Sequence, residues 1–190
     1  QLAPRLKEGA FIVLVALAIY LTLALVSFDK SDPGWTYTGS SESVNNIVGR
    51  SGAWVADVFF FFFGFIAYVF PMMLAWQAWL IFLEREIISE FNWPVFILKG
   101  LGLLLTIAAG TALATMHFYD IGDGFQYGSG GIFGAATAGF LVPAFSYVGA
   151  TLILLASFLS GLTIFLNLSW LNLMEAIGRL AMSLMRDLMS

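Results

Sequence analysis

Four stretches of this sequence contain no charged residue, and each is long enough to cross a lipid bilayer as a helix. The stretches are residues 9–28, 58–83, 100–119 and 124–174. The hydrocarbon core of a bilayer is about 30 Å thick, which requires about 20 residues of helix. Because a helix satisfies its own backbone polar groups in lipid, the stretches predict an all-α protein, a polytopic membrane helix bundle with four transmembrane helices.

Composition excludes several other classes of protein. Hydrophobic residues make up 60% of the chain and charged residues 11%, and the mean hydropathy is +0.90, values that are untypical of a soluble domain. The net charge of -4 and the lack of a basic run argue against direct binding of nucleic acid. The sequence has no cysteine, so thiolate metal sites and disulfides are excluded, and no cofactor is expected.

The distribution of basic residues predicts how the chain is oriented, because Lys and Arg are enriched in short cytoplasmic segments. With four spans, one side of the membrane receives most of them and the other side receives few. The first side holds Arg5, Lys7, Arg85, Lys99, Arg179 and Arg186, and the second holds Lys30 and Arg50. Both termini are therefore expected in the cytoplasm, with external loops at 29–50 and 117–143.

The stretch 124–174 is too long for one span, because a helix of that length would measure about 75 Å. We expect Pro143 to divide it, since proline lacks the amide donor and its ring clashes with the preceding turn. Residues 131–142 are too few to cross and are rich in Gly and Ala. If both pieces crossed, Arg179 and Arg186 would lie outside, against the charge distribution. We therefore predict a short interfacial or re-entrant helix before Pro143 and a full span after it.

These arguments predict a single membrane domain with spans at about 9–28, 58–83, 100–119 and 144–166. After the last span, residues 170–190 are expected to form an amphipathic cytoplasmic tail. Its apolar side chains recur at spacings of three and four, which is typical of a helix that lies on a membrane surface or binds a partner. These side chains are Leu173, Ile177, Leu180 and Leu184.

Charged and titratable residues are scarce near the spans. Asp57 is the carboxylate nearest to a span, and we expect it to be solvated at the helix start and loosely paired with Arg50, two turns earlier. The alternative is a functional intramembrane charge. His117 is the only histidine and lies near Asp120 and Asp123. It is expected to be a loop residue at the interface, because a metal site would need further ligands at fitting distances.

Nucleotide and hydrolytic chemistry are not predicted for this chain. A phosphate-binding P-loop needs a Gly-Lys-Ser or Gly-Lys-Thr sequence, and Lys7, Lys30 and Lys99 each follow another residue type. Ser129 lies in a Gly-Ser-Gly-Gly sequence that lacks the motif of a serine nucleophile. Its glycines are expected to permit a tight turn. The chain itself is therefore not expected to be an enzyme.

Small residues predict close helix packing in the third and fourth spans, since they let helix backbones approach each other. The third span carries Gly110 and Ala114, and the fourth carries Ser157 and Gly161. Two uses remain open, packing within one bundle and contact between subunits. The run of phenylalanines at 59–63 instead predicts a bulky face suited to lipid or to a neighbouring subunit.

Three segments carry strings more specific than membrane-protein composition. Residues 27–35 read Ser-Phe-Asp-Lys-Ser-Asp-Pro-Gly-Trp, residues 46–57 contain Gly-Arg-Ser-Gly-Ala-Trp, and residues 149–171 end in Leu-Ser-Trp-Leu. With these strings and the order of its spans, nearly the whole chain resembles the four-span N-terminal membrane domain of the FtsK/SpoIIIE family of DNA translocases.

The resemblance implies a function that the residues alone do not. It implies a membrane anchor, septal-targeting and oligomerisation domain of a cell-division DNA translocase, in the bacterial inner membrane at the division septum. The implied partners are the lipid bilayer, other cell-division membrane proteins and further copies of the chain, in a hexamer. DNA and ATP would be bound only by a cytoplasmic motor that is absent from these residues, so no catalytic residue is carried over.

Within this interpretation, the polar loop after the first span and the entry to the second are the expected external contact region. The residues concerned are Asp29, Asp32, Pro33, Trp35, Arg50, Trp54 and Asp57. A competing interpretation is a small polytopic transporter or channel subunit, which would need an ionisable or broken-helix site at mid-membrane. An intramembrane enzyme would need paired catalytic groups at matching depth, and the sequence offers none.

Overall fold

The computed structural model describes residues 2–38, 44–83, 93–118 and 128–166, with short pieces of the tail at 174–175, 177–179, 181–183 and 185. Every regular element within these ranges is a helix, which confirms the all-α prediction. The elements are α1 (Leu2–Val26), α2 (Gly49–Phe63), the 3-10 helix η1 (Gly64–Tyr68), α3 (Val69–Leu83), α4 (Trp93–His117) and α5 (Gly131–Leu166). Most of the predicted amphipathic tail, including Leu173, Leu180 and Leu184, lies outside the described residues.

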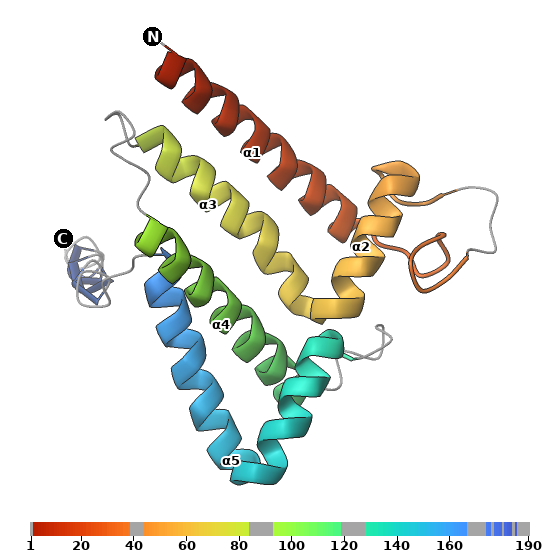
Figure 1. Ribbon diagram of the computed structural model, residues 1–190, viewed down its shortest axis with the longest axis vertical. Helices are drawn as coiled ribbons and strands as arrows, with labels where there is room; N and C mark the ends of the chain where they lie inside the picture. The colour runs from red at the N-terminus through yellow and green to blue at the C-terminus, as the bar shows by residue number, and fades with distance from the viewer. Residues whose placement is uncertain are drawn as a thin grey trace.

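Four helical segments are long and apolar enough to cross a membrane, which confirms the prediction of four spans. They are Lys7–Val26, Gly49–Leu83, Trp93–His117 and Gly131–Leu166. The second and fourth have 35 and 36 residues, more than a straight crossing needs. Both change direction along their length, as Figure 1 shows.

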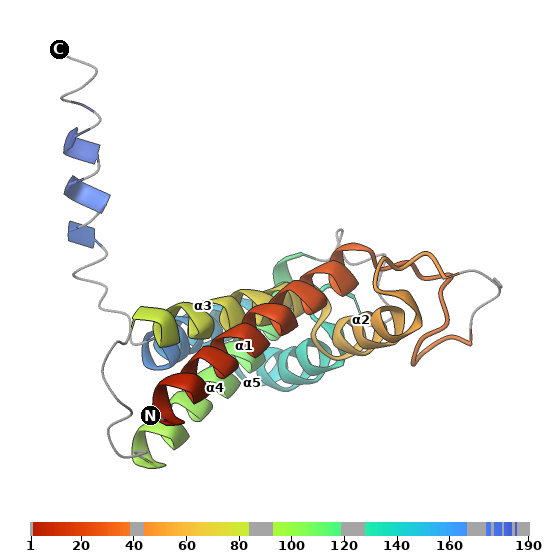
Figure 2. The ribbon, with the colours of Figure 1, turned by 90° about the horizontal axis from the view of Figure 1, so that it is seen from above.

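The helices pack as two antiparallel pairs, with α1 against α3 and α4 against α5 (Figure 1). The first residues of α1 and α4 and the last residues of α3 lie at one end of the bundle, and α2 lies at the opposite end. Figure 2 shows the same segregation from above. We call the end that carries α2 and the loop before it the loop end.

The second long helix begins at Gly49, well before residue 58, where the charge-free stretch starts. An absence of charge marks the part of a helix that lipid can bury, whereas the helix itself continues through Arg50 and Asp57 toward the loop. Its break lies at Gly64, which has φ +54°. A Cβ atom at Gly64 would collide with the Ser129 carbonyl, and the next amide, that of Phe65, donates a hydrogen bond of 2.7 Å to the same oxygen. Glycine is therefore required at this position, both for its positive φ and because a Cβ atom would not fit.

We predicted a break at Pro143, and this was wrong. The break in α5 lies at Ser146. The helix continues through Pro143, because a proline removes one backbone hydrogen bond and bends a helix without having to end it. Ser146 has φ 58° and ψ 171°, a backbone conformation that residues other than glycine rarely adopt. Its hydroxyl donates to the Phe145 carbonyl at 2.6 Å. We call residues 131–145 the first arm of α5 and 147–166 its second arm.

The two halves of the chain share one plan. A 25-residue helix, α1 or α4, is followed by a connection, an arm, a break and a returning span. Both arms start at a glycine of positive φ, Gly49 or Gly131, and both carry the string Gly-x-x-Gly-Ala-x-x-Ala. The breaks at Gly64 and Ser146 follow these glycines at the same spacing. The fold is therefore two similar units, the first unit (α1, α2, η1 and α3) and the second unit (α4 and α5).

The two units differ in how closely their paired spans approach. In the second unit, a Cβ atom at Gly102 would meet Ile164, and one at Gly161 would meet Thr106 and the Gly102 carbonyl. The backbones of α4 and α5 are therefore in near contact. In the first unit, α3 contains no glycine, and most of the buried cluster lies toward the loop end. That cluster comprises Leu21, Ala24, Leu25, Ala56, Phe60 and Ala67.

Candidate functional site

The polar loop between α1 and α2, residues 27–48, is organised by a nearly buried carboxylate. Asp32 is only 4% exposed, and its two oxygens accept the backbone amides of Asn45 at 2.7 Å and Asn46 at 2.9 Å. A buried carboxylate needs such partners, because burial without hydrogen bonds is costly. Asp32 therefore ties the first part of the loop to the residues that lead into α2.

Asp29 makes a second set of contacts at the end of α1. It accepts hydrogen bonds from the backbone amide of Ser31 at 2.9 Å, from the Ser31 hydroxyl at 2.7 Å and from the Asn45 side chain at 3.0 Å. The Ser31 amide is the main cause that lowers the pKa of Asp29 below its ordinary value, and the two side-chain bonds add to it. Because its pKa is lowered, this carboxylate is charged at neutral pH.

Asn46 is the residue of the loop that sequence reasoning missed. Its side-chain amide donates to the carbonyls of Ala24 at 2.8 Å and Ser27 at 3.2 Å, and its oxygen accepts the Val48 amide at 3.0 Å. It therefore satisfies backbone groups at the end of α1 and just before α2. An asparagine directly before a short turn and a glycine-led helix is the sequence signal for such a role.

Asp57 holds the other side of the loop. Its carboxylate accepts the backbone amide of Thr36 at 2.6 Å and the Thr36 hydroxyl at 3.0 Å. Gly34 lies so close that a Cβ atom there would collide with this carboxylate. We expected Asp57 to pair loosely with Arg50, and the structure corrects this, because both of its oxygens accept hydrogen bonds from Thr36 of the loop. In the described part of the chain, the salt bridge that does form is Arg179–Glu175, at 2.6 Å.

Two exposed tryptophans lie on this frame. The rings of Trp35, in the loop, and Trp54, in α2, meet edge to face with centroids 6.0 Å apart, and the side chains are 57% and 47% exposed. The turn that carries Trp35 follows the half-buried Pro33 and is closed by a hydrogen bond of 2.7 Å from the Gly34 amide to the Tyr37 carbonyl. We call Trp35, Trp54 and the exposed Tyr37 of the same turn the aromatic patch.

The structure thus brings together most of the residues expected to form a contact region. Asp29 and Asp32 in the loop and Asp57 in α2 hold the loop through hydrogen bonds, whereas Trp35 and Trp54 are exposed. Arg50 is exposed at the start of α2. What the sequence did not reveal is that the carboxylates bind backbone amides of the loop itself and so hold the aromatic patch in place.

The residues expected to pack helices lie elsewhere, in the second unit. Gly110 faces Phe158 of α5, and Gly161 faces Thr106 of α4. Ala114 is buried, and its carbonyl accepts the Ser129 hydroxyl at 2.6 Å. Ser157 is half-buried on α5. The phenylalanines at 59–63 largely pack within the chain, against Phe70 and Phe133 among others, and Phe60 is 2% exposed.

His117 lies at the end of α4, beside the break in α5. Its Nε2 atom is 3.1 Å from the Thr151 hydroxyl, and its Nδ1 atom is 3.0 Å from the Tyr147 hydroxyl. Tyr147 also donates to the Met116 carbonyl at 2.7 Å. Asp120 and Asp123 lie outside the described residues, and within those residues no cluster of three metal-ligating side chains occurs. The arrangement joins α4 to the second arm of α5.

One known family matches nearly the whole chain. Residues 3–178 match the profile described as the 4TM region of DNA translocase FtsK/SpoIIIE. The chain belongs to this family. It is thus a multi-pass region of an inner-membrane protein, with the four apolar helices that the family description names.

Curated relatives agree with this assignment. The chain is 41% identical over 185 residues to the DNA translocase FtsK of Pseudomonas syringae pv. syringae, with 97% of this chain and 23% of the relative covered. It is 39% identical over 183 residues to that of Pseudomonas aeruginosa, covering 96% and 23%, and 37% identical over 174 residues to that of Vibrio parahaemolyticus, covering 92% and 17%. No solved structure matches the chain.

The chain spans less than a quarter of the length of these relatives. The matched part is their membrane region, and the ATPase motor of a translocase lies outside it. This fits a chain whose three lysines are not preceded by the glycine of a P-loop.

Proposed function

We propose that the chain is the membrane anchor, septal-targeting and oligomerisation domain of a cell-division DNA translocase. The observation that carries the targeting role is the aromatic patch on its hydrogen-bonded frame. Tryptophan and tyrosine are enriched where proteins bind one another, because they bury much apolar area and keep a polar group available. A frame that already holds Trp35 and Trp54 in place reduces the entropy lost on binding.

In the proposed orientation, both termini are cytoplasmic and the aromatic patch faces outward, where other cell-division membrane proteins expose their own domains. The support is the excess of Lys and Arg at the end of the bundle opposite the patch, with Arg5, Lys7 and Lys99 all on that side. Copies of the chain would assemble into a hexamer, to match the motor of the family it resembles. DNA and ATP are then handled by that motor.

Localisation in dividing cells tests the targeting role. In a full-length translocase that carries this chain and a fluorescent protein, Trp35→Ala with Trp54→Ala is expected to reduce the septal signal several-fold while membrane insertion stays normal. Trp93→Ala is the matched control, because Trp93 is 64% exposed and begins α4 at the opposite end of the bundle. An unchanged septal signal in the double variant would refute the targeting role.

A transporter or channel subunit is the second candidate, and the two broken helices favour it, since many transporters bind substrate at such breaks. The chemistry at the breaks does not support it. Gly64 packs on Ser129 and Gly131, and the first arm of α5 packs on Phe62 and Phe63. None of the residues 58–83 and 128–166 is charged. The breaks therefore offer no charged side chain to bind an ion within the membrane.

A further inference from the structure

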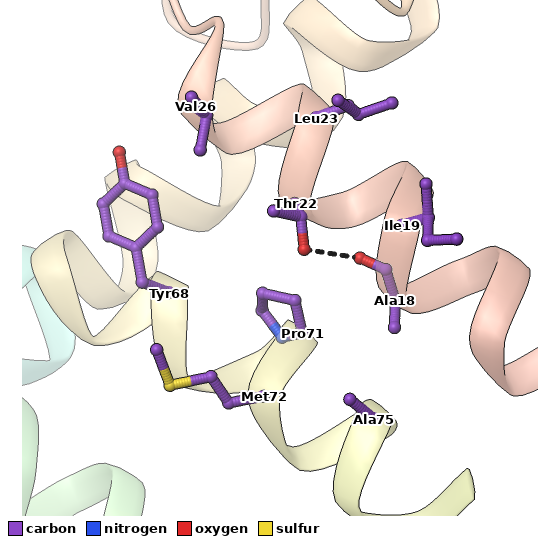
Figure 3. A pocket seen from close by; sticks show the side chains of 9 residues that line it. All are labelled: Ala18, Ile19, Thr22, Leu23, Val26, Tyr68, Pro71, Met72 and Ala75. Carbon is purple, nitrogen blue, oxygen red and sulfur yellow. Dashed lines mark hydrogen bonds between the residues drawn. The ribbon is translucent and has the colours of Figure 1, made fainter.

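An apolar groove runs between α1 and α3, on the part of α1 nearest the loop end. Figure 3 shows it from close by, with Ala18, Thr22 and Val26 on α1, and Tyr68, Pro71 and Ala75 on η1 and α3. Its volume is about 490 Å³. It opens to the side of the bundle, which in a membrane protein is the lipid.

The groove offers no free polar group to an occupant. The Thr22 hydroxyl donates to the Ala18 carbonyl of its own helix at 2.7 Å, as the dashed line in Figure 3 marks. The Tyr68 hydroxyl donates to the Leu25 carbonyl at 3.3 Å, beyond the groove. What remains is hydrocarbon surface and the faces of two rings. The occupant is therefore apolar over the length that the groove covers.

The size of the groove decides between two apolar occupants. Its lining residues cover about two helical turns, roughly 12 Å at about 1.5 Å per residue, so its mean cross-section is roughly 40 Å². A helix with its side chains is about 10–12 Å across and needs roughly twice that area. It also needs a seam through the whole hydrocarbon core, about 30 Å. A hydrocarbon chain, one methylene wide, needs neither.

We propose that this groove binds one acyl chain of a membrane phospholipid, which enters from the side and lies along α1 and α3. The chain fills a space that would otherwise leave Met72, Val26 and Ile19 without contacts on one face. The site lies on the part of α1 nearest the loop end. The proposal rests on the membrane-spanning fold. Under the orientation of the proposed function, the lipid belongs to the outer leaflet.

Photochemical labelling tests the proposal directly. The full chain is reconstituted in vesicles of phosphatidylethanolamine that carry a photoactivatable group in the acyl chain, and labelled peptides are identified by mass spectrometry. Label is expected to concentrate on the peptides that contain residues 18–26 and 68–75. Ala75→Phe fills the groove and is expected to lower this labelling about five-fold.

Ala156→Phe is the matched control, because Ala156 is an exposed alanine of the other returning span and lines no part of the groove. It is expected to leave the labelling of residues 18–26 and 68–75 unchanged. Ala75→Leu is a milder second variant, expected to give an intermediate loss. Helix content by circular dichroism checks that each variant is folded.

Two results would overturn the proposal. Label spread evenly over all apolar helices, or unchanged in Ala75→Phe, would mean bulk lipid contact only. The second concerns another copy of the chain in the groove. Because the sequence has no cysteine, Thr22→Cys introduces a single thiol, and its oxidation to a disulfide-linked dimer would place two copies there. Neither measurement depends on septal targeting, so loss of the targeting role would leave this result standing.

Discussion

The two units of this fold share one chain path and differ in how their spans meet. In the second unit, glycines at 102 and 161 bring the backbones of α4 and α5 together. In the first unit, α1 and α3 are kept apart by side chains and leave a lateral groove. The comparison teaches that the path of the chain is set by the arms and their breaks, whereas the closeness of the spans is set separately by the residues on the facing sides.

The largest expected effect comes from a side chain placed in the close contact between α4 and α5. Gly161→Leu places a side chain against Thr106 and the Gly102 backbone, with no flexible neighbour to move, and is expected to lower the free energy of unfolding by about 3 kcal/mol. Ala75→Leu, in the open groove of the first unit, is expected to change it by less than about 0.5 kcal/mol. Denaturation in mixed detergent micelles measures both. Equal losses of unfolding free energy in the two variants would show that the two pairs of spans do not differ in how closely they pack.

The break in the first unit is expected to give the next largest effect. Gly64→Ala requires a positive φ from alanine and drives its Cβ atom into the Ser129 carbonyl, so a loss of about 2 kcal/mol is expected in the same assay. Gly9→Ala is the control, since a Cβ atom at Gly9 meets nothing within 4 Å. A neutral Gly64→Ala variant would mean that the break can move along the helix.

A substitution at the break in the second unit is expected to raise the free energy of unfolding instead of lowering it. Ser146→Gly removes the strain of a positive φ at a residue with a side chain, at the cost of one exposed hydrogen bond to Phe145. The expected gain is about 1 kcal/mol. Ser157→Gly, in a regular part of α5, is the control and is expected to lose about 0.5 kcal/mol. Destabilisation by Ser146→Gly would show that the hydroxyl matters more than the backbone.

The smallest effect concerns the loop, for which the second unit has no described counterpart. The pKa of Asp29 is lowered in the folded chain, so its contribution is present at neutral pH and is lost as the pH falls through that lowered pKa. Proteolysis within the loop is therefore expected to become faster in acid, below about pH 4. Asp29→Asn should remove part of this dependence. An identical pH profile in the variant would contradict the role given to Asp29.

Much of the fold could be predicted from the sequence, because runs without charge report directly on lipid exposure. The four spans and the all-α class follow from that signal alone. The position of the second break could not be predicted, since Pro143 is the stronger local signal and a serine rarely adopts a positive φ. The contact between Asp57 and Thr36 was missed for a similar reason, because residues 21 positions apart meet only through the folded loop. The charge of Arg50 suggested that it pairs with Asp57, whereas in the structure Asp57 binds Thr36.

The contact at Gly64 has a mechanical consequence. The Phe65 amide is bonded to Ser129, and the Ser129 hydroxyl is bonded to Ala114, so this spot fastens the break of one unit to the start of the next arm and to α4. A pull on the chain after α5 would load the second unit first. Part of that load would reach the first unit through this contact, because the Phe65 amide and the Ser129 carbonyl join the two units directly.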